Sequence, residues 1–261
     1  MKVSIIIVTF NSWPEVQNCL KSIFEHTSNL EIEVVMVDNA SNDRTAAKVK
    51  TQFPQIKLIE NLKNLGFAAA NNLGVKNSSG GFLLFLNPDV ELFKDALNQL
   101  LQASKNDTSA GIISGLLIDQ GGKIQTTYIR NFPTPLKTIL FDTKLKVIAE
   151  LMPGLKRWYY PKINMGLKKQ KVDQPAGACM MIRRETFKKI GGFDEQFFLF
   201  FEDVDLAYRL KQAGYKNYVL PKVKLKHLGG MSIAKERKSK IRSQFLKSAK
   251  QYFKKQKKLR K

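Results

Sequence analysis

The chain has 261 residues, of which 43% are hydrophobic, and this is enough for one large globular domain or two small ones. Its formal net charge is +22, and the segment 235–261 holds thirteen Lys and Arg residues against one acid, Glu236, so this tail alone carries +12. Two isolated cysteines, Cys19 and Cys179, exclude a disulfide framework and a Cys-x-x-Cys metal site, which indicates a reducing cytosol.

Regular structure begins with a buried strand over 3–9, whose apolar run is too short and too rich in β-branched residues for a signal peptide. No later stretch reaches the roughly 18 apolar residues of a membrane-spanning helix. Further strands are predicted over 32–37, 56–60, 82–86, 110–118, 176–182, 217–220 and 223–228. Helices are predicted between them, ending near Glu25, Phe53, Val75, Ala103, Ile190 and Ala213. This alternation predicts a parallel sheet covered by helices.

Polar residues close three of these strands, those over 3–9, 32–37 and 82–86. Because the carboxyl ends of parallel strands share one edge of a sheet, we expect these residues to converge on one ligand pocket. Pro88 cannot donate to a strand ladder, so it ends the third strand and leaves Asp89 at that edge, beside Asn87. Asp89 is either an oxygen ligand of a divalent cation or part of an Asn-Pro-Asp turn. His227, before a Gly-Gly loop, is likewise either a metal ligand or structural.

A second acidic group, Glu202, Asp203 and Asp205, follows the aromatic segment 197–201. A metal-bound carboxylate and a separate carboxylate base suffice to transfer a group from a diphosphate donor, because the metal neutralises the leaving phosphate and the base takes the proton of the attacking hydroxyl. Nearby aromatic side chains would raise the pKa of that base by desolvation. Acids here also suit the start of a helix over 204–213, and both roles are compatible.

Two segments depart from the alternating pattern. Residues of about 128–172 predict an insertion at the rim of the sheet, either a lid or acceptor platform that includes Trp158, or an ordinary packed helical excursion. From Ile241 onward, apolar residues recur at helical spacing among Lys and Arg, which predicts a basic amphipathic helix. Such a helix suits an anionic membrane surface, and the alternative is a disordered, solubilising terminus.

Five motifs occur in order: Val-Thr-Phe-Asn at 8–11, Val-Asp-Asn-Ala-Ser at 37–41, Asn-Leu-Gly-Phe-Ala-Ala-Ala-Asn-Asn at 64–72, Leu-Asn-Pro-Asp at 86–89 and Phe-Glu-Asp-Val-Asp-Leu at 201–206. This ordered set resembles glycosyltransferase family 2, in its rhamnosyltransferase-like branch, over roughly residues 1–232. The resemblance implies a GT-A fold, an α/β architecture in which helices flank a mostly parallel central sheet. A Rossmann-like nucleotide-sugar half is expected over about 1–118, an acceptor half over about 119–234, and a basic amphipathic helical tail over 235–261.

The resemblance also implies a role for each matching position. Thr9, Asn11 and Asp38 would line the nucleoside site, with Asp38 reading a pyrimidine base. The rest of the donor pocket would comprise Asn39, Asn64, Gly66, Asn71, Asn87 and Asp89. Small residues in the 66–71 segment are equally suited to helix packing, so that alternative stays open.

Asn87-Pro88-Asp89 matches the metal-binding Asp-x-Asp motif of the family, with Asp89 as the ligand of Mg²⁺ or Mn²⁺. The first Asp is Asn87 here, so one negative charge is missing. His227 matches a second metal ligand, Asp203 matches the catalytic base, and Glu202 is the other candidate for that base. The acceptor side is assigned to Gly177, Ala178, Trp158 and Asp205.

The implied activity is an inverting, metal-dependent transfer of a sugar from a dTDP or UDP donor, with dTDP-rhamnose favoured. The acceptor would be a lipid-linked or polysaccharide hydroxyl in cell-envelope synthesis, and the enzyme would lie peripherally on the inner face of the cytoplasmic membrane. Asn87 keeps a non-catalytic nucleotide-sugar binder as an alternative, although Asp89, Asp203 and His227 argue against it. The high charge keeps a nucleic-acid binder as a weaker one, because the charge is concentrated in the tail and no nucleic-acid module is visible.

Overall fold

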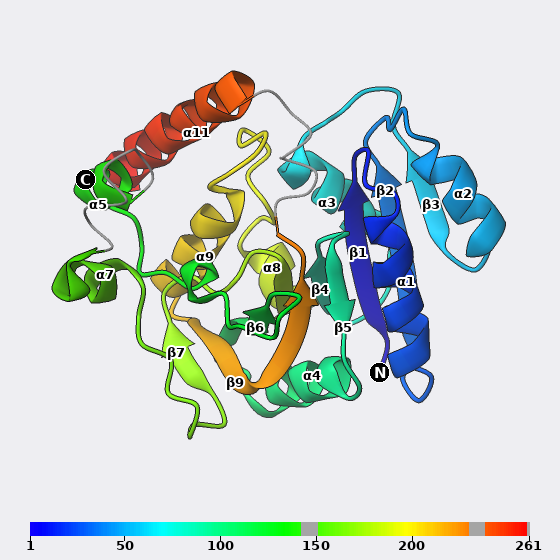
Figure 1. Ribbon diagram of the computed structural model, residues 1–261, viewed down its shortest axis with the longest axis horizontal. Coiled ribbons are helices and arrows are strands. Elements are labelled where there is room, and N and C mark those ends of the chain that lie inside the picture. Colours follow the sequence, from blue (N-terminus) through cyan, green and yellow to red (C-terminus); the bar gives the residue numbers. More distant parts are fainter. Residues whose placement is uncertain (142–150, 230–237, 260–261) are drawn as a thin grey trace.

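The computed structural model describes residues 1–141, 151–229 and 238–259 (Figure 1). The strands are β1 (Val3–Thr9), β2 (Ile32–Asp38), β3 (Lys57–Glu60), β4 (Phe82–Leu86), β5 (Val90–Leu92), β6 (Ala110–Ile118), β7 (Gln170–Val172), β8 (Cys179–Arg183) and β9 (Lys216–His227). The helices are α1 (Glu15–His26), α2 (Thr45–Gln52), α3 (Phe67–Lys76), α4 (Ala96–Asn106), α5 (Pro135–Phe141), α7 (Pro153–Tyr159), α8 (Arg184–Lys189), α9 (Glu202–Gln212) and α11 (Lys238–Leu259). A 3-10 turn, η1, covers Thr126–Tyr128.

In the described part of the chain all nine strands belong to one mixed, mostly parallel sheet, in the order β3-β2-β1-β4-β8-β6-β9-β5, with β7 paired to β9. The strands β3, β2, β1 and β4 run parallel, as the alternating sequence predicts. Antiparallel pairing begins at β8, whose neighbours are β4 and β6, whereas β6 and β9 are parallel to each other. The first four strands therefore share one carboxyl edge.

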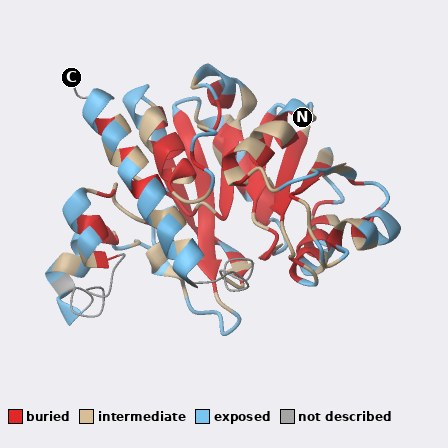
Figure 2. Ribbon diagram, turned by 90° about the horizontal axis from the view of Figure 1, so that it is seen from above, coloured by how far each residue is buried: buried red, intermediate tan, exposed pale blue. Residues whose placement is uncertain are grey.

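Helices cover both faces of the sheet, which gives three layers. Because side chains alternate along a strand, Ile5 and Ile7 of β1 pack on one face with α1 and α4, while Ile6 packs on the other face with α3, α8 and α9. Figure 2 shows the buried strands between these partly exposed helices. Burial on both faces explains why β1 and β4 read as continuous apolar runs.

The sheet departs from the prediction in two ways. The short strands β5 and β7 were not predicted, and both pair with β9. The two strands predicted over 217–220 and 223–228 form the single strand β9, which contains an irregularity opposite Gly115 and Leu116. Pro221 lies in that irregularity, where a residue without an N–H is tolerated, so the proline bends the strand without ending it.

The predicted insertion over about 128–172 contains α5, α7 and β7, and its residues 142–150 lie outside the described part of the chain. Phe141, Tyr159 and Tyr160 form a small aromatic core between α5 and α7. Trp158 remains 40% exposed, with the Lys137 ammonium 4.8 Å from its ring centre. The ends of the insertion therefore pack as helices, and Tyr159 rather than Trp158 faces inward.

Helix α11 packs against the acceptor half, on the side of α9 (Figure 1). Its apolar residues Phe245, Ala249, Tyr252 and Phe253 contact the aromatic cluster that includes Phe201. Protein therefore covers this apolar stripe, and the expected contact of the helix with an anionic membrane surface stays a prediction. The expected boundary between residues 234 and 235 lies outside the described residues. None of the helices described is both long and apolar enough to cross a membrane.

The turn before α3 depends on Gly66, which links the two halves. Its φ is +83°, and a Cβ there would collide with the Phe198 carbonyl oxygen, which accepts a hydrogen bond from Phe67 N at 2.8 Å. We expect Gly66→Ala to lower the free energy of unfolding by about 3 kcal/mol, because backbone strain and a backbone clash add. Chemical denaturation measures this, with Gly81→Ala as the control, since a Cβ at Gly81 meets nothing within 4 Å. Equal losses in both variants would contradict the assignment.

Candidate active site

The carboxyl ends of β1 and β2 bring two predicted donor residues together. Thr9 and Asp38 are paired in the parallel ladder and are both buried. Asp38 accepts hydrogen bonds from Ser41 N at 2.9 Å and from Ser41 Oγ at 2.5 Å. Desolvation raises the pKa of Asp38, although the Ser41 hydrogen bonds oppose this rise. The Thr9 hydroxyl is buried and has no hydrogen-bond partner among the described residues.

The other predicted donor residues frame the same edge through bonds within the chain. Asn11, at φ +50°, accepts from Asn42 N at 2.7 Å and so ties the loops after β1 and β2. The remaining bonds run from Asn39 Nδ2 to Gly66 O at 3.2 Å, from Gly66 N to Asn64 Oδ1 at 2.8 Å, and from Asn71 Nδ2 to Phe67 O at 2.9 Å. These side-chain amides hold the segment from Asn61 to α3 in place. They therefore have a structural role that the motif alone did not reveal.

Asp89 and His227 meet because β5 pairs with β9, which places Val90 opposite His227. His227 Nε2 lies 3.5 Å from Asp89 Oδ1, and both side chains are buried. Gln125 donates from Nε2 to His227 O at 3.1 Å, so its Oε1, 2.8 Å from His227 Nδ1, acts as an acceptor there. We therefore assign the proton to Nδ1, which leaves the Nε2 lone pair facing Asp89. Desolvation lowers the pKa of His227 despite the Asp89 charge, which favours this neutral form.

This pair fits a divalent cation as two of its ligands, one carboxylate oxygen and one neutral imidazole nitrogen. The described residues contain no group of three or more His, Cys, Asp or Glu side chains that could hold a metal ion. Any further ligands would have to come from a substrate, from water or from groups such as the Asn87 amide. Asn87 lines the neighbouring cavity, and its backbone N donates to Ala178 O at 2.9 Å.

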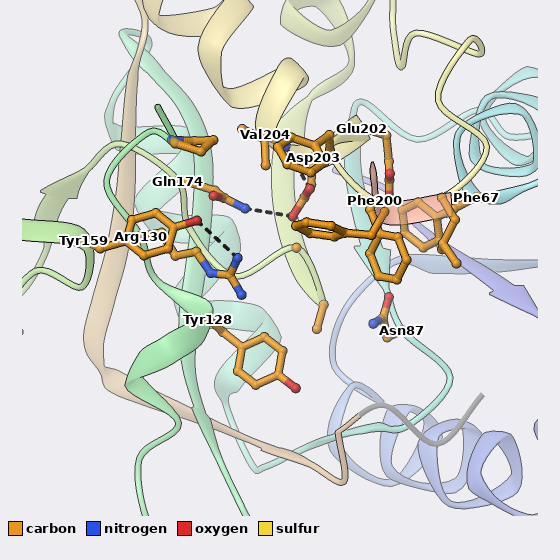
Figure 3. Close-up of a pocket in the computed structure, with 16 residues that line it drawn as sticks. Phe67, Asn87, Tyr128, Arg130, Tyr159, Gln174, Phe200, Glu202, Asp203 and Val204 are labelled. Carbon is orange, nitrogen blue, oxygen red and sulfur yellow. Dashed lines mark hydrogen bonds between the residues drawn. The ribbon is translucent and has the colours of Figure 1, made fainter. Parts of the chain in front are cut away.

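Asp203 lies in the first turn of α9 and faces this cavity (Figure 3). Its Oδ2 accepts a hydrogen bond from Gln174 Nε2 at 3.1 Å, and its Oδ1 accepts from Val204 N at 2.8 Å. Gly177 packs so closely that a Cβ there would overlap Asp203 Oδ2. Helix α9 begins at Glu202 and not at the predicted residue 204, so Asp203 lies within its first turn.

The two adjacent carboxyl groups differ in their environment. Desolvation raises the pKa of Asp203, against hydrogen bonds from Val204 and Gln174 and the charge of Arg130. Desolvation and the Asp203 charge raise the pKa of Glu202 well above its ordinary value. Glu202 is buried, and its Oε2 has no hydrogen-bond partner in the part of the chain that the structure describes. These contacts favour an ionised Asp203 beside a neutral Glu202, and an ionised carboxylate at a cavity wall can accept a proton.

The cavity joins residues from both halves of the chain. Its lining comprises Phe67, Asn87, Tyr128, Arg130, Pro133, Tyr159, Gln174, Gly177, Ala178, Leu199, Phe200, Phe201, Glu202, Asp203, Val204 and Phe245. The predicted residues Asn87, Gly177, Ala178, Glu202 and Asp203 thus come together. Sequence reasoning missed the other polar groups of the wall, Tyr128, Arg130 and Gln174, because they lie outside every motif. Figure 3 shows Arg130 and Gln174 on the same side as Tyr159, across from Phe67 and Phe200.

Two residues assigned to the acceptor do not line this cavity. Trp158 does not line the cavity, and its neighbour Tyr159 does. Asp205 is fully buried and forms ion pairs with Arg209 Nε at 2.6 Å and Lys255 Nζ at 2.8 Å. Its position corrects the sequence assignment, because alternate acids on a helix point in different directions. Asp205 fastens α9 to α11 instead of facing a ligand.

The family model described as glycosyl transferase family 2 matches residues 4–191. The chain belongs to glycosyltransferase family 2. A second model, described as N-terminal domain of galactosyltransferase, matches residues 166–233. The enzyme is 27% identical over 236 residues to the N-acetylglucosaminyl-diphospho-decaprenol L-rhamnosyltransferase of Mycobacterium tuberculosis, covering 85% of this chain and 75% of that one. It is 28% identical over 163 residues to the rhamnosyltransferase WbbL of Escherichia coli, covering 60% of this chain and 58% of that one.

Solved structures confirm the GT-A fold of this glycosyltransferase. GalNAc-T7 with UDP, GalNAc and Mn²⁺ aligns with a TM-score of 0.63 at 19% identity, over 87% of this chain and 44% of that one. The mannosyltransferase PcManGT of Pyrobaculum calidifontis, with GDP-Man and Mn²⁺, aligns with a TM-score of 0.59 at 19% identity, over 87% of this chain and 56% of that one. The chain thus spans about half the length of these solved proteins.

The contact between Gly177 and Asp203 predicts a selective loss of transfer. In Gly177→Ala the new methyl group displaces the Asp203 carboxylate, and we expect kcat to fall about 100-fold because a shift of about 1 Å misaligns the base. The folded state is retained, because a side-chain end can move more cheaply than backbone. Steady-state transfer with thermal unfolding measures both effects, and Gly154→Ala is the control, since a Cβ there meets nothing within 4 Å. A wild-type kcat in Gly177→Ala would refute this role of the contact.

Proposed function

We propose that this glycosyltransferase moves a sugar, with rhamnose from dTDP-rhamnose favoured, from a nucleoside diphosphate to a hydroxyl of a lipid-linked or polysaccharide acceptor, with inversion. The observation that carries the proposal is the Asp203 carboxylate, held by Gln174 and Val204 at the wall of a cavity that also reaches Asn87. A carboxylate base so placed can deprotonate a hydroxyl in that cavity.

The donor is proposed to bind along the carboxyl edge of β1, β2 and β4. The Thr9 hydroxyl and the Asp38 carboxylate offer the nucleoside polar contacts, and Asn11, Asn39, Asn64, Gly66 and Asn71 would shape the pocket around it. In support, the neighbouring structure of the staphylococcal protein TarS 1–349 is solved with UDP, at a TM-score of 0.58 and 19% identity. The diphosphate would then lie near Asn87 and Asp89, between the nucleoside and the acceptor cavity.

Asp89 Oδ1 and His227 Nε2 would hold a Mg²⁺ or Mn²⁺ ion, which supplies positive charge to the leaving diphosphate. Gln125 fixes the tautomer of His227, and Tyr128 packs edge-on against the imidazole at 4.8 Å between ring centres. Asn87 offers an uncharged oxygen where the family motif has a carboxylate, so the site holds one negative charge fewer. Solved neighbours with Mn²⁺ support this part of the proposal.

The proposed reaction is a single displacement. The acceptor hydroxyl oxygen attacks the anomeric carbon, and its proton passes to Asp203 Oδ2 or Oδ1. The bond between the anomeric carbon and the diphosphate oxygen breaks with its electron pair on the diphosphate, and the nucleoside diphosphate leaves. Attack from the face opposite the leaving group inverts the anomeric configuration, because only one displacement occurs. Gln174 and Val204 hold the carboxylate in place before the proton moves, and the charge of Arg130 favours its ionised form.

The choice of rhamnose and of a lipid-linked acceptor is drawn from relatives. The mycobacterial relative is by name a rhamnosyltransferase that acts on a diphospho-decaprenol sugar, and WbbL is also named as a rhamnosyltransferase. For the membrane partner, the outer side of α11 carries exposed Lys247, Lys250, Lys254, Lys257 and Lys258. This cationic side stays the proposed contact with anionic lipid, now without an apolar stripe to insert.

A donor screen tests the proposed function directly. Calorimetry with dTDP-, UDP- and GDP-sugars, each with and without Mn²⁺ or Mg²⁺, should show binding of one pyrimidine donor that the metal tightens about tenfold. Asp89→Asn should remove the metal-dependent part, because the carboxylate ligand loses its charge. Glu91→Gln is the matched control. Glu91 forms an ion pair with Lys226 at 3.1 Å and does not take part in the Asp89–His227 pair.

Each result of the screen has a defined meaning. Binding of no donor would overturn the proposed function. Binding of a donor without transfer to any acceptor would favour the alternative of a non-catalytic nucleotide-sugar binder, for which Asn87 in place of a carboxylate is the motivating observation.

Replacing each of the two adjacent acids by its neutral amide tests which one is the base. Asp203→Asn should lower kcat about 1,000-fold, and Glu202→Gln should leave it within a few-fold, because Glu202 is already neutral. The raised pKa of Asp203 fixes the pH dependence: as pH falls through that pKa the base is protonated, so activity is lost at a pH above the ordinary range of an aspartate. The acid limb of the kcat profile measures this. A large loss in Glu202→Gln with little loss in Asp203→Asn would reverse the assignment.

A further inference from the structure

The inner side of α11 is joined to the segment that carries the catalytic base. Its aromatic residues surround Phe201, whose ring centre lies 5.3 Å from that of Phe245, 5.4 Å from that of Tyr252 and 6.3 Å from that of Phe253. Ala249 and Tyr252 are buried in the same cluster. Residues 245, 249 and 252 recur at helical spacing, so they form the side of α11 that packs against the rest of the protein.

Polar contacts fix α11 on the same segment. Ser248 Oγ is buried and donates to Leu199 O at 2.7 Å. Lys255 Nζ lies 2.6 Å from Asp194 Oδ2 and 2.8 Å from Asp205 Oδ1, so one ammonium joins both ends of the segment to the helix. In sequence, Asp203 therefore lies between two residues that α11 contacts, Leu199 and Asp205.

The clamped segment has an unusual backbone. Phe200 and Phe201 both adopt left-handed conformations, with φ of +67° and +68°. Residues other than glycine hold such angles only where surrounding contacts enforce them. Here Phe200 and Phe201 both pack on Phe245, and α9 starts at the next residue, Glu202. Packing of α11 therefore bears on the position of Asp203.

Phe245 also reaches the cavity itself, as the one residue of α11 among the cavity-lining residues described. Together with Phe67 and Phe200 it makes one part of the wall aromatic, while Asp203, Gln174 and Arg130 make another part polar. An aromatic surface beside a hydroxyl-directed base suits a sugar ring, which offers an apolar C–H face and polar hydroxyl edges. Helix α11 lies outside both ranges matched by the family models, 4–191 and 166–233.

We propose that α11 is part of the acceptor site: Phe245 contacts the ring of the acceptor sugar, and the packing of α11 on residues 199–201 positions Asp203. This inference rests on the proposed function. It assigns acceptor selection to a helix beyond the family-matched part of the chain, with Phe245 as a specificity-determining residue and Ser248 as a positioning residue. Thr9 and Asp38 of the donor pocket lie at the ends of β1 and β2, outside the aromatic cluster that α11 joins.

The first test separates acceptor binding from donor binding. The probe is N-acetylglucosamine linked through a diphosphate to a short alkyl chain, with dTDP-rhamnose or the donor found by the screen. We expect Phe245→Ala to raise KM for this acceptor about tenfold and to leave Kd for the donor within about twofold. Leu246→Ala is the matched control, because Leu246 follows Phe245 in the helix, is 54% exposed and is not among the residues that line the cavity. Phe245→Tyr, which keeps the ring, should restore the wild-type KM.

The second test addresses positioning. Ser248→Ala removes the hydrogen bond to Leu199 O, and we expect kcat to fall about fivefold with KM for the acceptor unchanged. Ser243→Ala, an exposed serine of the same helix, is the control. Hydrogen exchange of residues 199–204 should rise in Ser248→Ala and not in the control, which reports packing independently of turnover.

The outcomes distinguish the two levels of the proposal. Turnover by the wild-type chain in the same assay supports the proposed function. If that turnover is present and Phe245→Ala and Leu246→Ala have the same acceptor KM, the inference about α11 is overturned and the proposed function stands. If Ser248→Ala changes neither the hydrogen exchange of residues 199–204 nor kcat, the positioning role is overturned.

Discussion

The acceptor half of the enzyme is organised around two adjacent carboxyl groups that water reaches poorly, Glu202 and Asp203. Placing such groups away from water is unfavourable unless they are hydrogen-bonded, paired or neutral. The structure uses two of these solutions on neighbouring residues. Asp203 receives two hydrogen bonds, from Gln174 and Val204, whereas burial and the Asp203 charge raise the pKa of Glu202 well above its ordinary value and favour its neutral form. A carboxylate held in this way can act as a base while its neutral neighbour fills space.

The third acid of this turn shows how charge burial is compensated. Asp205 is completely buried, and Arg209 and Lys255 lie within 2.8 Å of its oxygens. Arg209 also donates to Ile190 O at 2.6 Å and Gly192 O at 2.7 Å, so the pair is held by the loop after α8. An ion pair so well hydrogen-bonded offsets much of its desolvation. All three acids lie in the first turn of α9, where the helix dipole favours negative charge.

Sequence reasoning succeeded where a residue's environment follows from its own neighbours. The run 82–86 is apolar at every position, so it had to be a strand covered on both faces, and the end of that strand placed Asn87 at the cavity. It failed where the environment comes from a partner distant in sequence. The strands β5 and β7 have three residues each and exist because β9 lies beside them. Arg130 and Gln174 reach Asp203 only after an isolated bridge joins their backbones, and no local pattern announces that pairing.

The C-terminal helix illustrates the same limit in its clearest form. Amphipathic spacing predicts that a helix has an apolar partner, but it does not say whether that partner is lipid or protein. In this chain the partner is Phe201, and the helix meets it two residues before Asp203, the proposed base. Thr9, Asp38 and Asn87, in contrast, lie at or directly after the ends of strands in the sheet. The two halves therefore achieve precision differently: the donor edge through parallel strands close in sequence, and the acceptor wall through a late helix that packs against a strained loop. On the proposal that α11 forms part of the acceptor site, a change of acceptor would involve α11 and residues 199–201, whereas the strand ends at Thr9 and Asp38 would stay as they are.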